Sequence, residues 1–214
     1  MSNPINYSYL FKYIIIGDSS VGKSNILLRY TQDQFELDYK ITIGVEFAAK
    51  NIKIDRDIIR IQLWDTAGQE TFHSITRAYY SKCSCALIVY DISNRETFEN
   101  VKSWIEDCKE NSSENIYMVL IGNKMDLEDK RVVSYDEGEK FAKENNMPFI
   151  ETSAKTGENI EKAIYDSAEV IYKRVKDNFY DLSDESCGIK VGIVNNIESF
   201  EYTDYQKSNN KCCN

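Results

Sequence analysis

A stretch of eight residues near the start of the chain, Gly17–Ser24, has the residue types and spacing that bind phosphate. It reads Gly-Asp-Ser-Ser-Val-Gly-Lys-Ser and fits the pattern G-x-x-x-x-G-K-[ST]. Its glycines let backbone N–H groups surround a polyphosphate, and a helix that begins there adds the positive end of its dipole. Lys23 can reach the β- and γ-phosphates, and the Ser24 hydroxyl can ligate Mg²⁺. The motif therefore predicts a site for a nucleotide with its magnesium ion.

The motif requires a strand before it and a helix after it. Residues 10–16 are dense in β-branched and aromatic side chains, and residues 25–30 suit the first turns of a helix. An ordinary turn before a helix would explain the glycines alone, but these flanking segments favour a phosphate loop.

Three more polar segments come directly after predicted strands. They are Asp65–Glu70, Asn123–Asp126 and Thr152–Lys155. In a doubly wound sheet, ligands bind outside the carboxyl ends of the strands. We therefore expect these segments and Gly17–Ser24 to converge on one edge of the sheet, a far more specific signal than any one of them.

Four residues are candidates for the phosphate and metal end of the site. Asp65 is placed to hold Mg²⁺ through water, and Thr42 is placed to close over the ion and the γ-phosphate. Gly68 can offer its N–H to the γ-phosphate with no side chain in the way, and the neutral amide of Gln69 could orient an attacking water. The alternatives are a helix-cap or turn residue for Asp65, a strand-start residue for Thr42 and a surface residue for Gln69. The last two alternatives would hold if the loops did not occur together.

The identity of the base is predicted from Asp126. A carboxylate can accept hydrogen bonds from both N1–H and N2–H₂ of guanine, whereas adenine has no matching pair of donors. Asn123 is suited to pin its loop and to contact N7, and the stem of Lys124 can lie along the ring. These residues predict a guanine nucleotide; an adenine-nucleotide enzyme such as a kinase is the alternative.

Strands alternate with helices from residue 9 to about residue 176. Besides the segments above, alternation, apolar runs and helical spacing predict strands at 43–54, 58–64, 85–90, 116–121 and 147–151, and helices near 98–108, 134–145 and 160–175. A polar turn makes the first two of these strands a hairpin. The predicted class is α/β: a phosphate-loop NTPase fold with a six-stranded, mainly parallel sheet, one antiparallel edge strand and helices on both faces.

The composition fits one domain with a tail. The chain has 214 residues, of which 42% are hydrophobic, and this is enough for a packed core. A formal net charge of −9 argues against nucleic acid as a partner. No apolar run approaches the ~18–20 residues of a membrane-spanning helix. The first residues resemble no secretory signal and position 2 is Ser, so we expect reduced cysteines and no N-myristoylation.

Residues 179–214 differ in composition from the rest of the chain. They contain six acidic residues and three lysines, with many Asn, Ser and Tyr. We expect a flexible tail there, behind a nucleotide-binding domain of residues 1–178. Apolar residues such as Ile189 and Val191 could dock on a partner. The tail contains two adjacent cysteines, Cys212 and Cys213, which are either a lipid attachment site or incidental surface thiols.

Together these residues resemble the small GTPases of the Ras superfamily. Five nucleotide loops match in order and spacing: Gly17–Ser24, Thr42, Trp64–Glu70, Asn123–Asp126 and Thr152–Lys155. Ile43–Phe47 and Leu87–Ser93 are similar to stretches of the Rab family. Tyr7–Asp18 with Ser74–Arg77 is most similar to its Rab-two and Rab-fourteen branch. The resemblance covers roughly residues 8–176.

The resemblance implies further site residues. Phe35 would stack near the guanine, Ala154 would offer its N–H to the base, and Lys155 would support the pocket. Two switches would lie at about 35–44 and 66–81. The implied nucleotide-binding set is Ser19, Ser20, Val21, Gly22, Lys23, Ser24, Asn25, Phe35, Thr42, Gly68, Asn123, Lys124, Asp126, Ser153, Ala154 and Lys155. The other implied roles are metal binding by Ser24, Thr42 and Asp65, catalysis by Gln69, and geranylgeranylation of Cys212 and Cys213.

The resemblance also implies a function. A Rab GTPase binds GTP and GDP with Mg²⁺, hydrolyses GTP, and recruits effectors in its GTP state to regulate vesicle traffic, here early secretory or Golgi. Expected partners are an exchange factor, a GTPase-activating protein, a GDP-dissociation inhibitor, a prenylation escort protein and trafficking effectors. The domain is expected to be monomeric and to lie on the cytosolic face of ER–Golgi, Golgi or endosomal membranes, with a cytosolic pool. The alternative is a scaffold that holds GTP without hydrolysing it, which an intact Gln69 disfavours.

Several residues depart from the pattern of this branch. Thr71 and His73 stand where arginines are usual, and Tyr79–Lys82 reads Tyr-Tyr-Ser-Lys rather than Tyr-Tyr-Arg-Gly. These positions line the second switch, so they bear on effectors and regulators rather than on nucleotide chemistry. Ser19 and Ser20 replace smaller residues; because Ser19 approaches the γ-phosphate, we expect an altered intrinsic hydrolysis rate.

Overall fold

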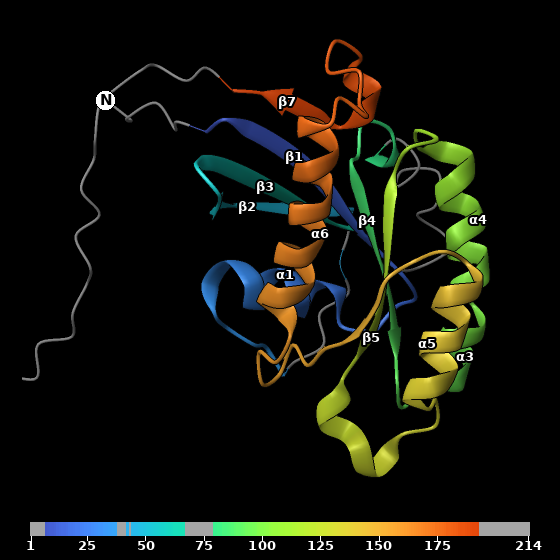
Figure 1. The fold of residues 1–214 in the computed structure, drawn as a ribbon. Helices are drawn as coiled ribbons and strands as arrows, with labels where there is room; N and C mark the ends of the chain where they lie inside the picture. The colour runs from blue at the N-terminus through green and yellow to red at the C-terminus, as the bar shows by residue number, and fades with distance from the viewer. Residues whose placement is uncertain (1–6, 38–41, 43, 67–78, 193–214) are drawn as a thin grey trace, which may run out of the picture.

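The protein is built around a twisted sheet with helices on both faces (Figure 1). This computed structural model describes residues 7–37, 42, 44–66 and 79–192. Six strands cross the sheet in the order β2-β3-β1-β4-β5-β6. Their bounds are β1 Tyr9–Ile16, β2 Val45–Ile54, β3 Asp57–Thr66, β4 Cys85–Asp91, β5 Tyr117–Asn123 and β6 Phe149–Glu151.

The pairing of these strands follows the prediction. Every neighbouring pair along the path is parallel except β2–β3, the predicted hairpin, in which Ile54 lies opposite Asp57. All seven residues of β4 are buried, as its continuous apolar run indicates for a central strand covered on both faces. The α/β class, the mainly parallel sheet and the antiparallel edge strand are therefore confirmed.

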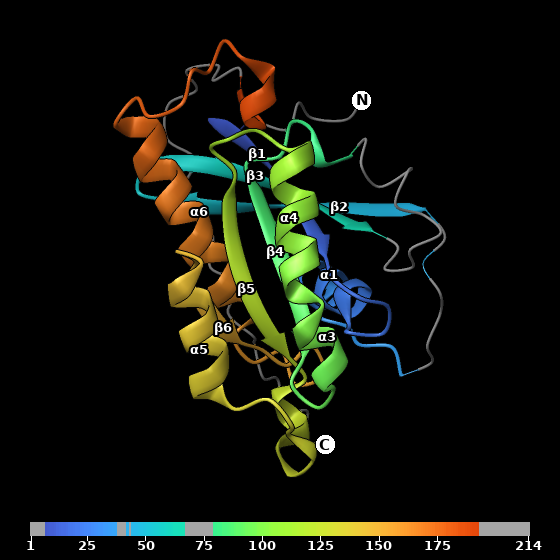
Figure 2. The same ribbon diagram turned by 90° about the vertical axis from the view of Figure 1, so that its right-hand side faces the viewer.

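The described helices cover the two faces of the sheet as two separate layers (Figures 1 and 2). Helices α1 (Lys23–Gln32) and α6 (Ile160–Lys176) pack in one hydrophobic cluster with the sheet. Helices α3 (Arg95–Glu99), α4 (Val101–Asn111) and α5 (Tyr135–Glu144) contribute to a second cluster on the other face. A 3-10 helix, η2 (Met125–Lys130), follows β5. No described helix is long and apolar enough to span a bilayer.

Most helices form where the sequence pattern predicts them. Helix α6 buries the six side chains at the predicted spacing: Ile160, Ala163, Ile164, Ser167, Ile171 and Val175. Helix α5 is capped by Ser134, whose hydroxyl accepts a 3.2 Å hydrogen bond from the N–H of Glu137. The helix predicted near 98–108 is interrupted, because Asn100 ends α3 and precedes α4.

Part of the predicted flexible tail is folded. Glu185–Cys187 forms a 3-10 helix, η3, and Ile189–Val191 forms β7, which pairs antiparallel with β1. The described sheet therefore has seven strands rather than six, and folded structure extends to Gly192 rather than ending at residue 178. The cause is apolar burial, since Tyr180, Cys187 and Ile189 lie in the same hydrophobic cluster as α6. Residues 193–214, with Cys212 and Cys213, are outside the described residues.

We refer to residues 179–192 as the C-terminal strap. The strap approaches the domain closely at Gly188, which has a φ of 70°; a Cβ there would lie 2.3 Å from backbone atoms of Cys83 and Ser84. The Gly188 carbonyl accepts a 3.0 Å hydrogen bond from the N–H of Lys12. An exposed ion pair joins Lys82 to Glu185 at 2.7 Å, and such pairs contribute little. Apolar burial therefore accounts for most of the docking of the strap.

We predict that Ile189→Ala lowers the free energy of unfolding by about 2 kcal/mol or more, because it removes a fully buried side chain from the core. Val191→Ala is the matched control, since Val191 lies in the same strand but is 60% exposed; we expect a change within about 0.5 kcal/mol. Urea unfolding followed by circular dichroism measures both. Equal small effects would mean that the strap does not contribute to stability.

Candidate nucleotide-binding site

The phosphate loop joins the end of β1 to the start of α1. Gly17 has a φ of 139°, and a Cβ there would lie 2.2 Å from the carbonyl oxygen of Val89. Gly22 has a φ of 100°, and a Cβ there would lie 2.4 Å from Nδ2 of Asn123. Both positions admit only glycine. The two glycines of the motif are thus required by the packing of neighbouring segments as well as by phosphate binding.

Lys23 is a buried charge at the N-terminus of α1, with 6% of its surface exposed. Its Nζ donates hydrogen bonds to the carbonyl oxygens of Gly17 (2.8 Å) and Asp18 (2.7 Å). Burial lowers the pKa of Lys23 to about 8, although the charges of Asp65 and Asp18 act in the opposite direction. The charges of Asp65 and Asp18 therefore offset the burial of the ammonium only in part, and a polyphosphate beside it would supply further negative charge.

Ser24, Thr42 and Asp65 meet from three separate segments. Ser24 Oγ donates a 2.5 Å hydrogen bond to Asp65 Oδ2 and lies 2.8 Å from Thr42 Oγ1. The Thr42 hydroxyl is also 3.4 Å from the same carboxylate oxygen. The other oxygen, Asp65 Oδ1, is buried and accepts no hydrogen bond from the part of the chain that the structure describes. An unpaired buried carboxylate oxygen beside two hydroxyls is a donor set that fits Mg²⁺.

The electrostatics of Asp65 agree with this fit. Burial raises the pKa of Asp65 to about 6, while the hydrogen bond from Ser24 and the charge of Lys23 act to lower it. The carboxylate form is thus less stable than in water, even with Lys23 nearby. A divalent cation would supply the missing positive charge and keep the group ionised.

Asn123, at the end of β5, ties three loops together. Its side chain is 1% exposed, and its Nδ2 donates a 2.8 Å hydrogen bond to the carbonyl oxygen of Val21 in the phosphate loop. Its Oδ1 accepts hydrogen bonds from Thr152 Oγ1 (3.1 Å) and from the N–H of Ala154 (3.2 Å). The expected pinning of the loop is present. The Ala154 N–H, which we expected to face the base, is directed at Asn123 in this structure.

Asp126 is held by the loop that follows β6. Its Oδ1 accepts a 2.6 Å hydrogen bond from Ser153 Oγ, and Lys155 Nζ lies 3.7 Å from its Oδ2. The side chain of Asp126 is 12% exposed. The carboxylate is therefore fixed in place, and it keeps the lone pairs needed to accept from two N–H groups of a guanine edge.

Lys124 and Asn25 fix two other walls. The Lys124 ammonium lies 2.7 Å from Oδ2 of Asp91, at the end of β4. The Asn25 amide donates to the carbonyl oxygen of Glu36 (3.1 Å) and accepts from the Glu36 N–H (2.9 Å). This reciprocal pair anchors the segment that carries Phe35, whose ring packs against the core cluster of α1.

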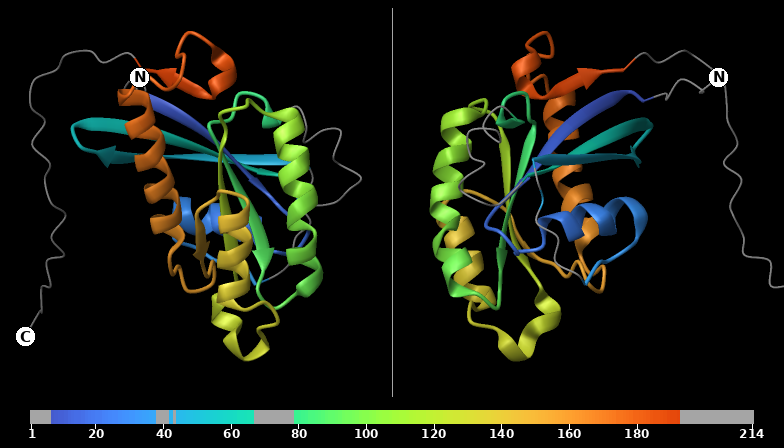
Figure 3. Two further views of the ribbon diagram at one scale, coloured as in Figure 1. Left: turned by 45° about the vertical axis from the view of Figure 1, so that its right-hand side comes forward. Right: turned by 180° about the vertical axis from the view of Figure 1, so that it is seen from behind.

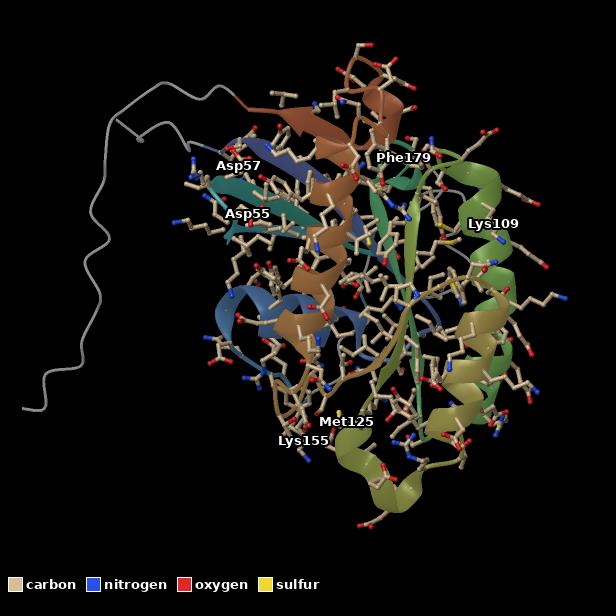
Figure 4. All side chains as sticks on the ribbon, in the orientation of Figure 1. Asp55, Asp57, Lys109, Met125, Lys155 and Phe179 are labelled. Atoms are coloured by element: carbon tan, nitrogen blue, oxygen red, sulfur yellow. The ribbon has the colours of Figure 1, made fainter. Side chains whose placement is uncertain are left out.

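These groups surround one cavity of about 750 Å³, within the size range of small-molecule sites. Figure 4 shows the labelled Lys155 and Met125 at the lower end of the molecule, with Asp57 and Phe179 at the upper end. The predicted residues that line the cavity are Ser19, Ser20, Gly22, Lys23, Ser24, Asn25, Phe35, Thr42, Asn123, Lys124, Asp126, Ala154 and Lys155.

Some predicted residues do not line this cavity. Val21, Asp65 and Ser153 are buried behind the lining, where they support it. Gly68 and Gln69 are outside the described residues, as are Thr71 and His73. A second hollow of about 570 Å³, beside β6 and α6, contains none of the predicted site residues.

Comparison with known families decides between the two nucleotides. The sequence model of the Ras family matches residues 12–173, a span that includes the phosphate loop, Asn123–Asp126 and Thr152–Lys155. The chain belongs to the Ras family. It is therefore a small GTPase switch that binds GTP and GDP, and its relatives generally use Mg²⁺ with the nucleotide. Membership removes the adenine-nucleotide alternative.

Two residues that hold the site together were not expected from the sequence. Arg29 of α1 donates hydrogen bonds to the carbonyl oxygens of Ala154 (2.9 Å) and Lys155 (2.8 Å), so one helix positions both the phosphate loop and the loop after β6. Asp91 is the partner of Lys124. No local pattern marks either residue, because their partners are distant in the chain.

We predict that Asn123→Ala lowers the free energy of unfolding by about 2–3 kcal/mol even without nucleotide, because it leaves buried polar groups of two other loops unpaired. Urea unfolding in EDTA measures this. Asn145→Ala is the control, since that half-buried amide donates a hydrogen bond within its own helix end, to the Phe141 carbonyl. An unchanged stability of Asn123→Ala would show that Asn123 acts only as a ligand contact.

Proposed function

We propose that this Ras-family GTPase is a Rab-type switch: membrane-anchored, active in its GTP state, and regulating intracellular vesicle traffic, early secretory or Golgi. One observation carries the chemistry of the proposal. A buried lysine, a fixed carboxylate and the two hydroxyls of an oxygen set suited to Mg²⁺ line one cavity, and Asp65, the carboxylate of that set, lies against the two hydroxyls. These are the partners that the phosphates, the metal and the guanine base of GTP require.

Each residue has a defined part in the proposed hydrolysis. Mg²⁺, when bound, would neutralise negative charge on the β- and γ-phosphate oxygens. Lys23 would offset the charge that develops on the oxygen bridging them. Gln69 would orient the attacking water, and Gly68 would donate its N–H to the γ-phosphate. No arginine occurs from residue 35 to residue 44, so we expect slow intrinsic turnover that depends on an activating protein.

The product of this cycle is a change of conformation. Thr42 lies against Ser24 and Asp65 and would contact both the metal and the γ-phosphate. When the γ-phosphate leaves, Thr42 and Gly68 would lose their partner, and the switches at about 35–44 and 66–81 would relax.

We predict that Gln69→Leu slows single-turnover GTP hydrolysis by about 10-fold or more, because leucine cannot hold the water in an attacking position. Affinity for GTP should not change. Gln62→Leu makes the same substitution in β3 and is the control. If Gln69→Leu hydrolyses GTP at the wild-type rate, Gln69 has no part in the mechanism. If the wild type shows no turnover even with an activating protein, the scaffold alternative holds.

A row of aromatic rings supports a Rab-type role for effectors. Phe47 of β2 stacks on Trp64 of β3 with ring centroids 5.0 Å apart, and Trp64 lies 5.3 Å from Tyr79. Phe47 is 56% exposed. The row runs from Phe47, just after the first switch (about 35–44), to Tyr79, near the end of the second switch (about 66–81). A partly exposed aromatic surface in this position suits effectors that distinguish the two nucleotide states.

Cys212 and Cys213 are the proposed anchor, each carrying a geranylgeranyl group. One lipid chain binds a membrane only marginally, and a tail with more acids than lysines offers no polybasic second signal. Both lipids are therefore required. The protein would lie on the cytosolic face of ER–Golgi, Golgi or endosomal membranes. A prenylation escort protein would deliver it, and a GDP-dissociation inhibitor would maintain its cytosolic pool.

We predict that Cys213→Ser moves the protein from the membrane fraction to the cytosol of eukaryotic cells, because a single lipid does not hold it. Fractionation followed by immunoblotting measures the distribution. Ser208→Ala in the same tail is the control and should stay on membranes. A Cys213→Ser protein that remains firmly membrane-bound would contradict the two-lipid proposal.

A further inference from the structure

The acidic residue of the phosphate loop, Asp18, is held by two side chains of a distant segment. Trp104 Nε1 donates a 2.7 Å hydrogen bond to Asp18 Oδ1, and Asn100 Nδ2 donates a 2.8 Å hydrogen bond to Oδ2. Each carboxylate oxygen thus accepts one short bond. Asn100 directly precedes α4 and Trp104 lies in its first turn, so the two residues, four apart, share one face of the helix.

These bonds turn the carboxylate away from the nucleotide cavity. Asp18 does not line the cavity, although its neighbours Ser19 and Ser20 do. The main chain of Asp18 does serve the site, because its carbonyl oxygen accepts a 2.7 Å hydrogen bond from Lys23 Nζ. Asp18 therefore joins Lys23 on one side to α4 on the other.

Core packing does not explain these contacts. Helix α4 packs through Val101, Ile105 and Cys108 against the cluster on its face of the sheet (Figure 2). The ring of Trp104 joins that cluster, and any large apolar residue could fill its volume. A large apolar residue at position 104 would have no donor for Asp18, whereas the indole N–H of Trp104 supplies one.

We propose that Asn100 and Trp104 are positioning residues for nucleotide binding, which act by holding Asp18 and thereby fixing the phosphate loop. The proposal rests on the guanine-nucleotide function of the same cavity. Hydrogen bonds to a charged acceptor are stronger than neutral ones. A loop that is ordered before the nucleotide arrives avoids the entropy cost of ordering it on binding. Loss of these bonds loosens Ser19, Ser20 and Lys23, and nucleotide release becomes faster.

A double-mutant cycle tests this. Full-length protein is loaded with fluorescent GDP and Mg²⁺, and release is followed after addition of excess unlabelled GDP. The variants are Trp104→Phe, which keeps an aromatic ring but has no N–H, Asp18→Ala, and the two combined. Asn100→Ala tests the second bond. Asn111→Ala is the matched control, since that residue lies in the same helix and bonds to Asp107 one turn earlier.

The expected result is that Trp104→Phe speeds GDP release by about 10-fold or more in protein with Asp18. In the Asp18→Ala background the same substitution should change release by less than about 2-fold, since no carboxylate remains to be held. Asn100→Ala should behave like Trp104→Phe, and Asn111→Ala like the wild type.

Two outcomes would overturn the inference. One is unchanged release in Trp104→Phe and Asn100→Ala. The other is an equal acceleration by Trp104→Phe with and without Asp18, which would mean that the ring matters only for packing. Melting temperatures of all variants separate packing losses from loop effects. Failure of the wild type to retain GDP is a different result, because it would contradict the proposed function itself.

Discussion

The buried amide of Asn123 is the interaction on which the geometry of the site depends. It bonds at once to the phosphate loop, to Thr152 and to the N–H of Ala154. Gly22 leaves the space that this amide occupies. Because a buried polar network is costly unless every member is satisfied, the three loops hold one relative arrangement rather than several. The site is therefore assembled by contacts between loops, not by the conformation of any single loop.

Lys23 and Asp65 are buried charged groups in this site. A bound nucleotide would place its phosphates beside Lys23 and its divalent cation beside Asp65. Burial lowers the pKa of Lys23 to about 8 and raises that of Asp65 to about 6, so each charged form is less stable here than in water. A bound nucleotide with its divalent cation would offset the cost of burying both charges, because the phosphates are negative and the cation is positive. Ligands that bind only the folded state stabilise it by mass action, so stability and occupancy of the site are coupled. Because of the same coupling, loss of one phosphate can change the conformation of the protein.

The sequence predicts the parts of this structure that local chemistry determines. Helical spacing is sufficient to predict which face of α6 is buried. The spacing of the phosphate-loop motif is sufficient to place Lys23 and Ser24 at the start of α1. The C-terminal strap was missed because β7 has only three residues within a polar, acidic segment, and its pairing depends on the distant β1. Arg29 and the contacts of Asp18 were missed for the same reason. Their partners are remote in sequence, so residue type alone could not identify them.

The strap also determines where the tail leaves the domain. The C-terminal end of β1 leads into the phosphate loop, whereas its first residues pair with β7, and the N–H of Gly192 bonds to the carbonyl of Ser8 at 2.8 Å. The eight residues of β1 separate these ends by about 25 Å. Figure 3 shows the strap, in red, at the end of the sheet away from η2. Gly192, the last described residue, therefore lies at the end of the domain opposite the cavity. Docking of residues 179–192 also shortens the extended reach of the tail by up to about 45 Å. The proposed anchor would thus hold the GTPase domain closer to the membrane than a tail that was free from residue 179 onward.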